Sequence, residues 1–339
     1  MINIKPLINP YEYIQITKPK GYSISLKVGE IVKAEVVDIL PSGGVVIRMK
    51  GAYITVRTEI PLQKDSSLLL QILQLPEDNR LKISLLSVLN QKGQININKA
   101  EFSRLDIKSL ASLIDIENVT EFEKIMLFQI IKEKISPYRN VIYPLSINSI
   151  YPDNLRYAVY NSGIFLESKL KNILKGKKED LKNDIKANLL QQIEDNNLFH
   201  NLLQTNTKKK ALLNDIYLYQ LLSKLTESVY TYIPISLKQI KNFDFSYKRE
   251  QNGGNFVKLD LSFEEKGRVL VIVTYYQNYL NIFFKFEDSD FKKQAENHID
   301  KLKQKLSPIK INIFFIEDKV PFDRLETFEI SKHLLDIKT

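Results

Sequence analysis

The spacing of hydrophobic residues changes twice along this chain, and this change most limits how the chain can fold. Apolar residues alternate or gather in short runs between Ile31 and Leu86. From about Ala100 they recur every three or four residues, and after Pro234 the short runs return. A period of two is typical of strands, and a period between three and four is typical of helices. The sequence therefore predicts an α+β protein with a β-rich module at each end.

The first module is predicted to be a small antiparallel β-barrel at residues 23–90. Turn-forming stretches such as Pro41-Ser42-Gly43-Gly44 separate its apolar runs, and five short strands at this spacing favour a barrel. The prolines of residues 1–22 predict an extended arm before it. The five expected strands are Ile31 to Leu40, Val45 to Met49, Tyr53 to Ile60, Leu68 to Leu75 and Leu81 to Leu86.

Helical periodicity follows, interrupted once by prolines. It predicts a helical segment at residues 100–136 and a central helical bundle at 154–230. Between them, residues 137–153 contain Pro137, Pro144 and Pro152, and we interpret this stretch as a connector.

Residues 234–317 are predicted to form a C-terminal α+β domain. Antiparallel strands are expected first, then one amphipathic, Lys-rich helix from Ser289 to Leu306 that covers a sheet face, and then a returning strand at Ile309 to Ile316. Residues 318–339 remain as a C-terminal tail. The antiparallel strands are expected at Phe243 to Tyr247, Phe256 to Phe263, Val269 to Tyr275 and Leu280 to Phe286.

Composition narrows the chemistry that this chain can perform. The 339 residues include no Cys, which excludes disulfides, iron–sulfur clusters, thiolate zinc sites and cysteine nucleophiles. Only three His are present, far apart, and no phosphate-binding glycine loop occurs. We therefore expect a protein that is not an enzyme, with no catalytic residues, no metal and no cofactor.

Charge and hydropathy bear on partners and location. Forty-nine Lys and Arg against 40 Asp and Glu give a formal charge of +9, which attracts polyanions or acidic protein surfaces. Because no run of about 20 apolar residues and no secretory signal is visible, we expect a cytoplasmic protein without membrane insertion.

Two pairs of neighbouring aromatic residues are candidates for partner binding. Tyr275 and Tyr276 are adjacent in one expected strand, and Phe283 and Phe284 are adjacent in the next. Successive side chains of a strand point to opposite faces, so one of each pair can point away from the core. Such residues could form a partner-binding face or a base-stacking platform, or they could lie on a second sheet face that helices cover.

Two segments carry a family resemblance. The first is Ser162-Gly163-Ile164-Phe165-Leu166-Glu167, where a glycine stands inside an otherwise helical stretch. The second is Asp180 to Leu190, which is expected to begin another helix. Together they resemble the core of the flagellar hook-length control protein family, and the resemblance extends over roughly residues 150 to 317. It continues through Tyr232-Ile233-Pro234-Ile235, Val257 to Phe263 and Lys266-Gly267-Arg268-Val269. The residues that match the family motif are Ser162, Gly163, Phe165, Glu167, Leu181, Lys186 and Gly267.

This resemblance implies a non-enzymatic regulator of flagellar type III secretion. Such a protein acts through its C-terminal domain on the cytosolic domain of the export gate, and switches the gate from hook-type to filament-type substrates. The resemblance also implies possible export through the flagellar secretion apparatus. The alternative is a nucleic-acid-binding protein that uses the N-terminal barrel and the basic surface.

Overall fold

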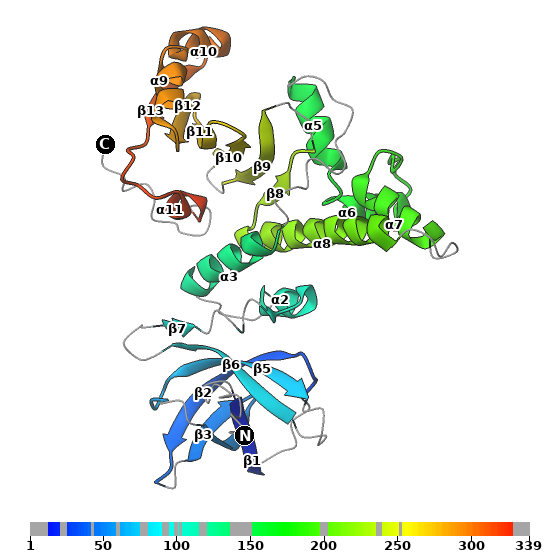
Figure 1. Ribbon diagram of the computed structural model, residues 1–339, viewed down its shortest axis with the longest axis vertical. Helices are drawn as coiled ribbons and strands as arrows, with labels where there is room; N and C mark the ends of the chain where they lie inside the picture. The colour runs from blue at the N-terminus through cyan, green and yellow to red at the C-terminus, as the bar shows by residue number, and fades with distance from the viewer. Residues whose placement is uncertain are drawn as a thin grey trace, which may run out of the picture. The chain divides into compact units, whose positions relative to one another are not determined.

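The chain is an α+β protein with two compact units, residues 1–119 and residues 120–339. Its computed structural model (Figure 1) has an antiparallel N-terminal sheet, helices in the middle and a second sheet near the C-terminus. The structure describes residues 13–20, 26–41, 44–58, 62–74, 81–89, 95–97, 101, 104–114, 121–135, 151–196, 203–234, 239–250 and 253–327.

The N-terminal unit is built on one sheet of seven antiparallel strands in the order β1-β4-β3-β2-β5-β6-β7. Strand β1 pairs with β4 on one side and with β6 on the other, so it touches strands from both halves of the sheet. The strands are β1 (Tyr13–Lys20), β2 (Ile31–Ile39), β3 (Gly44–Met49), β4 (Ala52–Arg57), β5 (Ser67–Gln74), β6 (Leu81–Leu89) and β7 (Ile95–Ile97).

The core of this unit lies on one face of the sheet, as strand alternation requires. In β3, Val45, Ile47 and Met49 are buried, whereas Arg48 is exposed. Helix α2 (Ile107–Ile114) belongs to the same unit. Asp106 begins this helix, because its carboxylate accepts a hydrogen bond of 2.7 Å from the backbone N–H of Ser109.

The five strands predicted for this unit correspond to β2 through β6. Two further strands, β1 and β7, were not predicted. The first lies in residues 1–22, where we expected an extended arm, because the prolines there interrupt any helix. Pro19 does sit in β1, opposite Ile54, and a register irregularity lies nearby between Ile16 and Lys18.

The C-terminal unit contains a six-stranded sheet in the order β13-β12-β11-β10-β9-β8. Neighbouring strands are antiparallel except for β12 and β13, which run parallel. The strands are β8 (Val229–Tyr232), β9 (Ile240–Arg249), β10 (Asn255–Phe263), β11 (Gly267–Tyr276), β12 (Tyr279–Phe286) and β13 (Lys310–Phe315).

Helices of this unit precede the sheet, interrupt it and follow it. The long helix α8 packs against α3, α7 and β8. Apolar residues of α5 pack on β9 and β10, and Leu325 of α11 packs on the other sheet face with Phe256 and Leu270. The helices are α3 (Glu121–Lys134), α5 (Pro152–Asn161), α6 (Leu166–Leu174), α7 (Ile185–Asn196), α8 (Leu203–Thr226), α9 (Ser289–Glu296), α10 (Ile299–Leu306) and α11 (Phe322–Glu326).

The helices differ from the sequence-based expectation in three places. The single helix expected from Ser289 to Leu306 is broken at Asn297 and His298 into α9 and α10. A break follows Asn161 as well, so that α5 and α6 are separate helices. In addition, the short helix α11 lies within the expected C-terminal tail.

Most of the connector predicted at residues 137–153 lies outside the described residues, and its last two residues begin α5. No helix in the described ranges is both long enough and apolar enough to cross a membrane.

Candidate functional site

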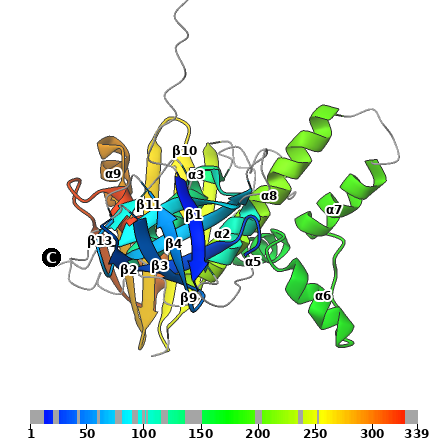
Figure 2. The same ribbon diagram turned by 90° about the horizontal axis from the view of Figure 1, so that it is seen from below.

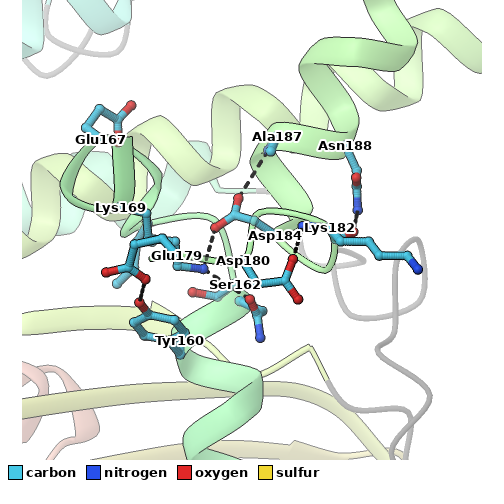
Figure 3. A network of polar contacts seen from close by, with 12 residues as sticks. Tyr160, Ser162, Glu167, Lys169, Glu179, Asp180, Lys182, Asp184, Ala187 and Asn188 are labelled. Carbon is cyan, nitrogen blue, oxygen red and sulfur yellow. Dashed lines mark hydrogen bonds and ion pairs between the residues drawn. The ribbon is translucent and has the colours of Figure 1, made fainter. Parts of the chain in front are cut away.

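Four of the seven motif residues meet where α5, α6, α7 and α8 join, namely Ser162, Gly163, Glu167 and Lys186. Figure 3 shows the network of polar contacts at this place. Gly163 occupies the break between α5 and α6 with a positive φ of 97°. A Cβ atom at this position would lie only 2.8 Å from Cβ of Lys186 and 3.0 Å from its backbone nitrogen. Glycine therefore allows the break to approach α7 closely, which a side chain would prevent.

Lys169 and Asp184 form a fully buried ion pair at the centre of this network. Their side chains are 1% and 0% exposed, and Nζ lies 2.9 Å from Oδ2. Lys169 also donates to Oδ1 of Asn161 at 3.0 Å, and its Nζ lies 4.1 Å from the centre of the Tyr160 ring. Asp184 accepts from the backbone N–H of Ala187 at 3.1 Å, so the same carboxylate caps α7.

Lys186 is buried too, and it reaches a half-exposed carboxylate. Its ammonium group forms a short ion pair with Glu167 and donates to Gln220 at 3.0 Å. Gln220 in turn donates to Glu167 at 2.7 Å, which joins α6, α7 and α8. Burial by itself would raise the pKa of Glu167, but the hydrogen bond and charge of Lys186, together with hydrogen bonds from the backbone and from Gln220, lower it by more. The pKa of Glu167 therefore lies below its ordinary value.

Ser162 connects this network to the sheet. Its hydroxyl donates to the carbonyl of Val159 at 2.7 Å and accepts from the hydroxyl of Thr231 at 3.0 Å. The Tyr232 hydroxyl donates to the Ser162 carbonyl at 3.2 Å. The network thus ties the helices to β8, and its buried groups bond mainly to one another, which is the arrangement of a structural joint.

The remaining motif residues lie around or away from this joint. Phe165 stacks on Tyr160 with ring centres 6.2 Å apart, and Leu181 lies in the turn before α7. We expected the Asp180 to Leu190 segment to be helical from its start, but α7 begins only at Ile185. Gly267 lies elsewhere, at the start of β11 opposite Phe263.

The two aromatic pairs do not form one surface. Phe283 packs against the buried cluster of Phe256, Leu270 and Ile272, whereas Phe284 points to the opposite face of the sheet. Tyr275 lies on the same face as Phe284, and Tyr276 is exposed beside the turn between β11 and β12. At most two of the four residues can therefore contact one flat partner.

A second buried polar cluster, which the sequence did not reveal, lies on the sheet face that carries Phe283. Lys132 of α3 lies 2.7 Å from Asp244 and 3.7 Å from Asp260. Arg268 donates two hydrogen bonds to Asp260, at 2.8 and 2.6 Å. Burial would lower the pKa of Lys132, but the two carboxylates raise it above its ordinary value, so the ammonium stays charged.

The N-terminal unit presents a different kind of surface, which we call the β2–β4 face. The cross-strand register places Glu35, Arg48 and Tyr53 side by side on β2, β3 and β4. All three side chains are accessible, and Tyr53 is 45% exposed. Arg57 is also exposed four residues beyond Tyr53, on the same side of β4. Arg48 forms an ion pair with Glu35.

No group of three or more His, Asp and Glu side chains in the described ranges could hold a metal ion.

Comparison with known proteins gives one result, and it concerns the N-terminal unit. Residues 14–84 match the family of the TP0910 S1-like domain, a span that includes most of β1 through β6. No curated protein and no solved structure matches the chain.

Proposed function

We propose that the N-terminal unit binds single-stranded nucleic acid on the β2–β4 face. The observation that carries this proposal is the exposed ring of Tyr53, which lies directly opposite Arg48 in a unit that resembles an S1-like domain. A flat ring on a strand can stack against any base, and guanidinium groups beside it can bind phosphates or stack in turn.

The strand pairing supports a fold of the oligonucleotide-binding kind. Because β1 pairs with both β4 and β6, we propose that the sheet closes on itself as a small barrel. In this arrangement β2, β3 and β4 are neighbouring strands of the barrel wall. Their outward-pointing side chains form one continuous strip on the barrel surface.

Fluorescence anisotropy with labelled single-stranded RNA and DNA tests the proposal. We expect salt-sensitive binding at micromolar protein, since phosphate contacts release counterions. Tyr53→Ala should weaken binding about five- to 100-fold, the usual effect of one lost stacking ring. Tyr279→Ala is the matched control, because Tyr279 is 47% exposed but lies in the other unit. The proposal fails if the two variants behave alike or if no binding is seen.

A second function is proposed for the C-terminal unit. It is that of a non-enzymatic regulator resembling the flagellar hook-length control proteins, which acts on the cytosolic domain of the type III export gate. The two segments that carry the resemblance support it, because Gly163 and Glu167 from the first both contact Lys186 from the second. We propose the sheet face with Tyr275 and Phe284 as the surface that contacts the gate.

Two experiments test this second function separately from the first. A pull-down with the purified cytosolic domain of the export gate should retain the full chain. Deletion of the gene should alter hook length or block filament assembly. Normal hooks and normal filaments in the deletion strain would refute the regulator, whatever the nucleic-acid measurements show.

A further inference from the structure

Exposed apolar side chains of the C-terminal unit are concentrated on α5, on α6 and just before α5. Six of the eight large apolar residues that are exposed in the described part of this unit lie there. Other apolar residues of these helices, such as Ala158 and Leu166, are buried, so the two helices have a buried apolar side and an exposed apolar side. The six residues are Tyr151, Tyr157, Tyr160, Leu170, Ile173 and Leu174.

Helix α6 displays three of these residues at its C-terminal end. Leu170, Ile173 and Leu174 are spaced as one stripe of a helix, and Leu174 in the last turn is 88% exposed. Figure 2 shows α6 pointing away from the sheet of this unit. A side chain as apolar as Leu in that position exposes surface that water solvates poorly.

The end of α6 is held in a defined shape. Gly176, with a φ of 77°, donates its N–H to the Ile173 carbonyl at 2.8 Å, and Lys177 donates to the Asn172 carbonyl at 3.0 Å. These two bonds are the Schellman arrangement that ends a helix. The apolar stripe is therefore presented by an ordered helix end.

Basic residues surround this end. From Leu170 to Lys178 the sequence has four lysines and no acidic residue. All four lysine side chains, at positions 171, 175, 177 and 178, are exposed. The next acidic residue, Glu179, already accepts hydrogen bonds from Tyr160 and Asn172.

We propose that this end of α6, residues 170–178, binds the surface of a membrane that contains anionic lipids. Charge complementarity favours this partner, because the four lysines attract lipid phosphates while the three apolar side chains enter the boundary between headgroups and acyl chains. A projecting helix end fits a deformable surface, and tyrosines such as Tyr157 suit the same interface. The contact is peripheral and requires no spanning helix.

Vesicle co-sedimentation with the full-length chain tests the proposal. We expect the protein to bind vesicles that contain about one third phosphatidylglycerol, and to remain in solution with pure phosphatidylcholine vesicles. The combined variant Lys175→Gln, Lys177→Gln, Lys178→Gln should lower the partition coefficient about tenfold or more. Leu174→Ser together with Ile173→Ser should lower it about fivefold or more.

Two matched controls keep the result specific. The variant Lys208→Gln, Lys209→Gln, Lys210→Gln removes the same charge from the start of α8, and Tyr279→Ser removes an exposed apolar residue from the sheet. Both should sediment like the unchanged protein. The proposal is overturned if the α8 variant loses as much binding as the α6 variant, if vesicle charge has no effect, or if the unchanged protein does not bind. Light scattering gives a further test. If it shows a dimer that Leu174→Ser converts to monomer, the apolar stripe binds a second copy of the chain, and the membrane proposal is overturned.

Discussion

Gly163 lies so close to Lys186 that a methyl group at position 163 would approach the lysine Cβ to 2.8 Å. This close contact lets the backbone between α5 and α6 pack against the first turn of α7. The Lys186 side chain can then extend to Glu167 on α6 and Gln220 on α8. In the sequence Gly163 interrupts a helical pattern. In the structure it is the point at which α5, α6 and α7 meet.

The first prediction concerns this glycine. Gly163→Ala should lower the free energy of unfolding by about 2–4 kcal/mol, because it adds a positive-φ penalty to an overpacked contact. Gly176→Ala has a similar φ but meets nothing within 4 Å, and should cost only about 1 kcal/mol. Urea denaturation of both variants measures the difference, and equal losses would show that the close approach does not matter.

The buried Lys169 and Asp184 pair should show strong energetic coupling. Asp184→Ala should destabilise the protein by about 3–5 kcal/mol, because it leaves a buried ammonium group without its partner and removes the cap of α7. The double variant Lys169→Met, Asp184→Asn should lose less free energy of unfolding than its two single variants lose together. The difference should be about 1–3 kcal/mol. Additive losses in denaturant titrations would contradict this. Glu317→Ala serves as the surface comparison, because it breaks only the exposed ion pair with Lys319. It should leave the midpoint of denaturant unfolding unchanged.

Acid should weaken the joint through Glu167. Its pKa in the folded protein is below the ordinary value of 4.5, so ionised Glu167 stabilises the fold above that pH. This contribution is lost as the pH falls below 4.5 and through the folded pKa. The difference in melting temperature between the unchanged protein and Glu167→Gln should therefore be largest near neutral pH and shrink in acid. A difference that stays constant down to about pH 3 would rule out this linkage.

The ion pair on the β2–β4 face makes a prediction about affinity. Glu35 holds Arg48, so phosphate must replace a carboxylate there. Glu35→Gln should strengthen binding of single-stranded RNA about two- to fivefold at low salt, since it releases the arginine. Glu317→Gln makes the same charge change in the other unit and should have a much smaller effect in anisotropy titrations. If both changes act equally, net charge and not Arg48 sets the affinity.

The sequence predicted strands well where turn residues bracketed apolar runs. Each of β2 through β6 and β9 through β13 lies at an expected position, because turns and alternation are local signals. Strand β1 was missed because its proline suggested an arm, and its pairing partners in β4 and β6 are distant in sequence. The break at Asn297 and His298 has no proline or glycine to announce it.

The buried charges were the least predictable part. A lysine in a helix is normally solvated, so Lys169 and Lys186 look like surface residues in the sequence. One signal was present: Lys169 follows Leu166 by three residues and therefore shares its inward helical face. Which carboxylate would meet each lysine depends on tertiary packing, and no local pattern contains that information.

The parallel strand β13 also has a consequence for how the C-terminal unit acquires its shape during synthesis. Strands β11 and β12 meet across a tight turn, with Tyr276 opposite Tyr279, so they can pair as soon as both have left the ribosome. In contrast, Lys310 of β13 must return to Tyr279 across 31 positions that include α9 and α10. A nascent chain therefore holds a nearly complete sheet with one open aromatic edge until its last strand arrives, and chaperones have their best opportunity to recognise it during that interval.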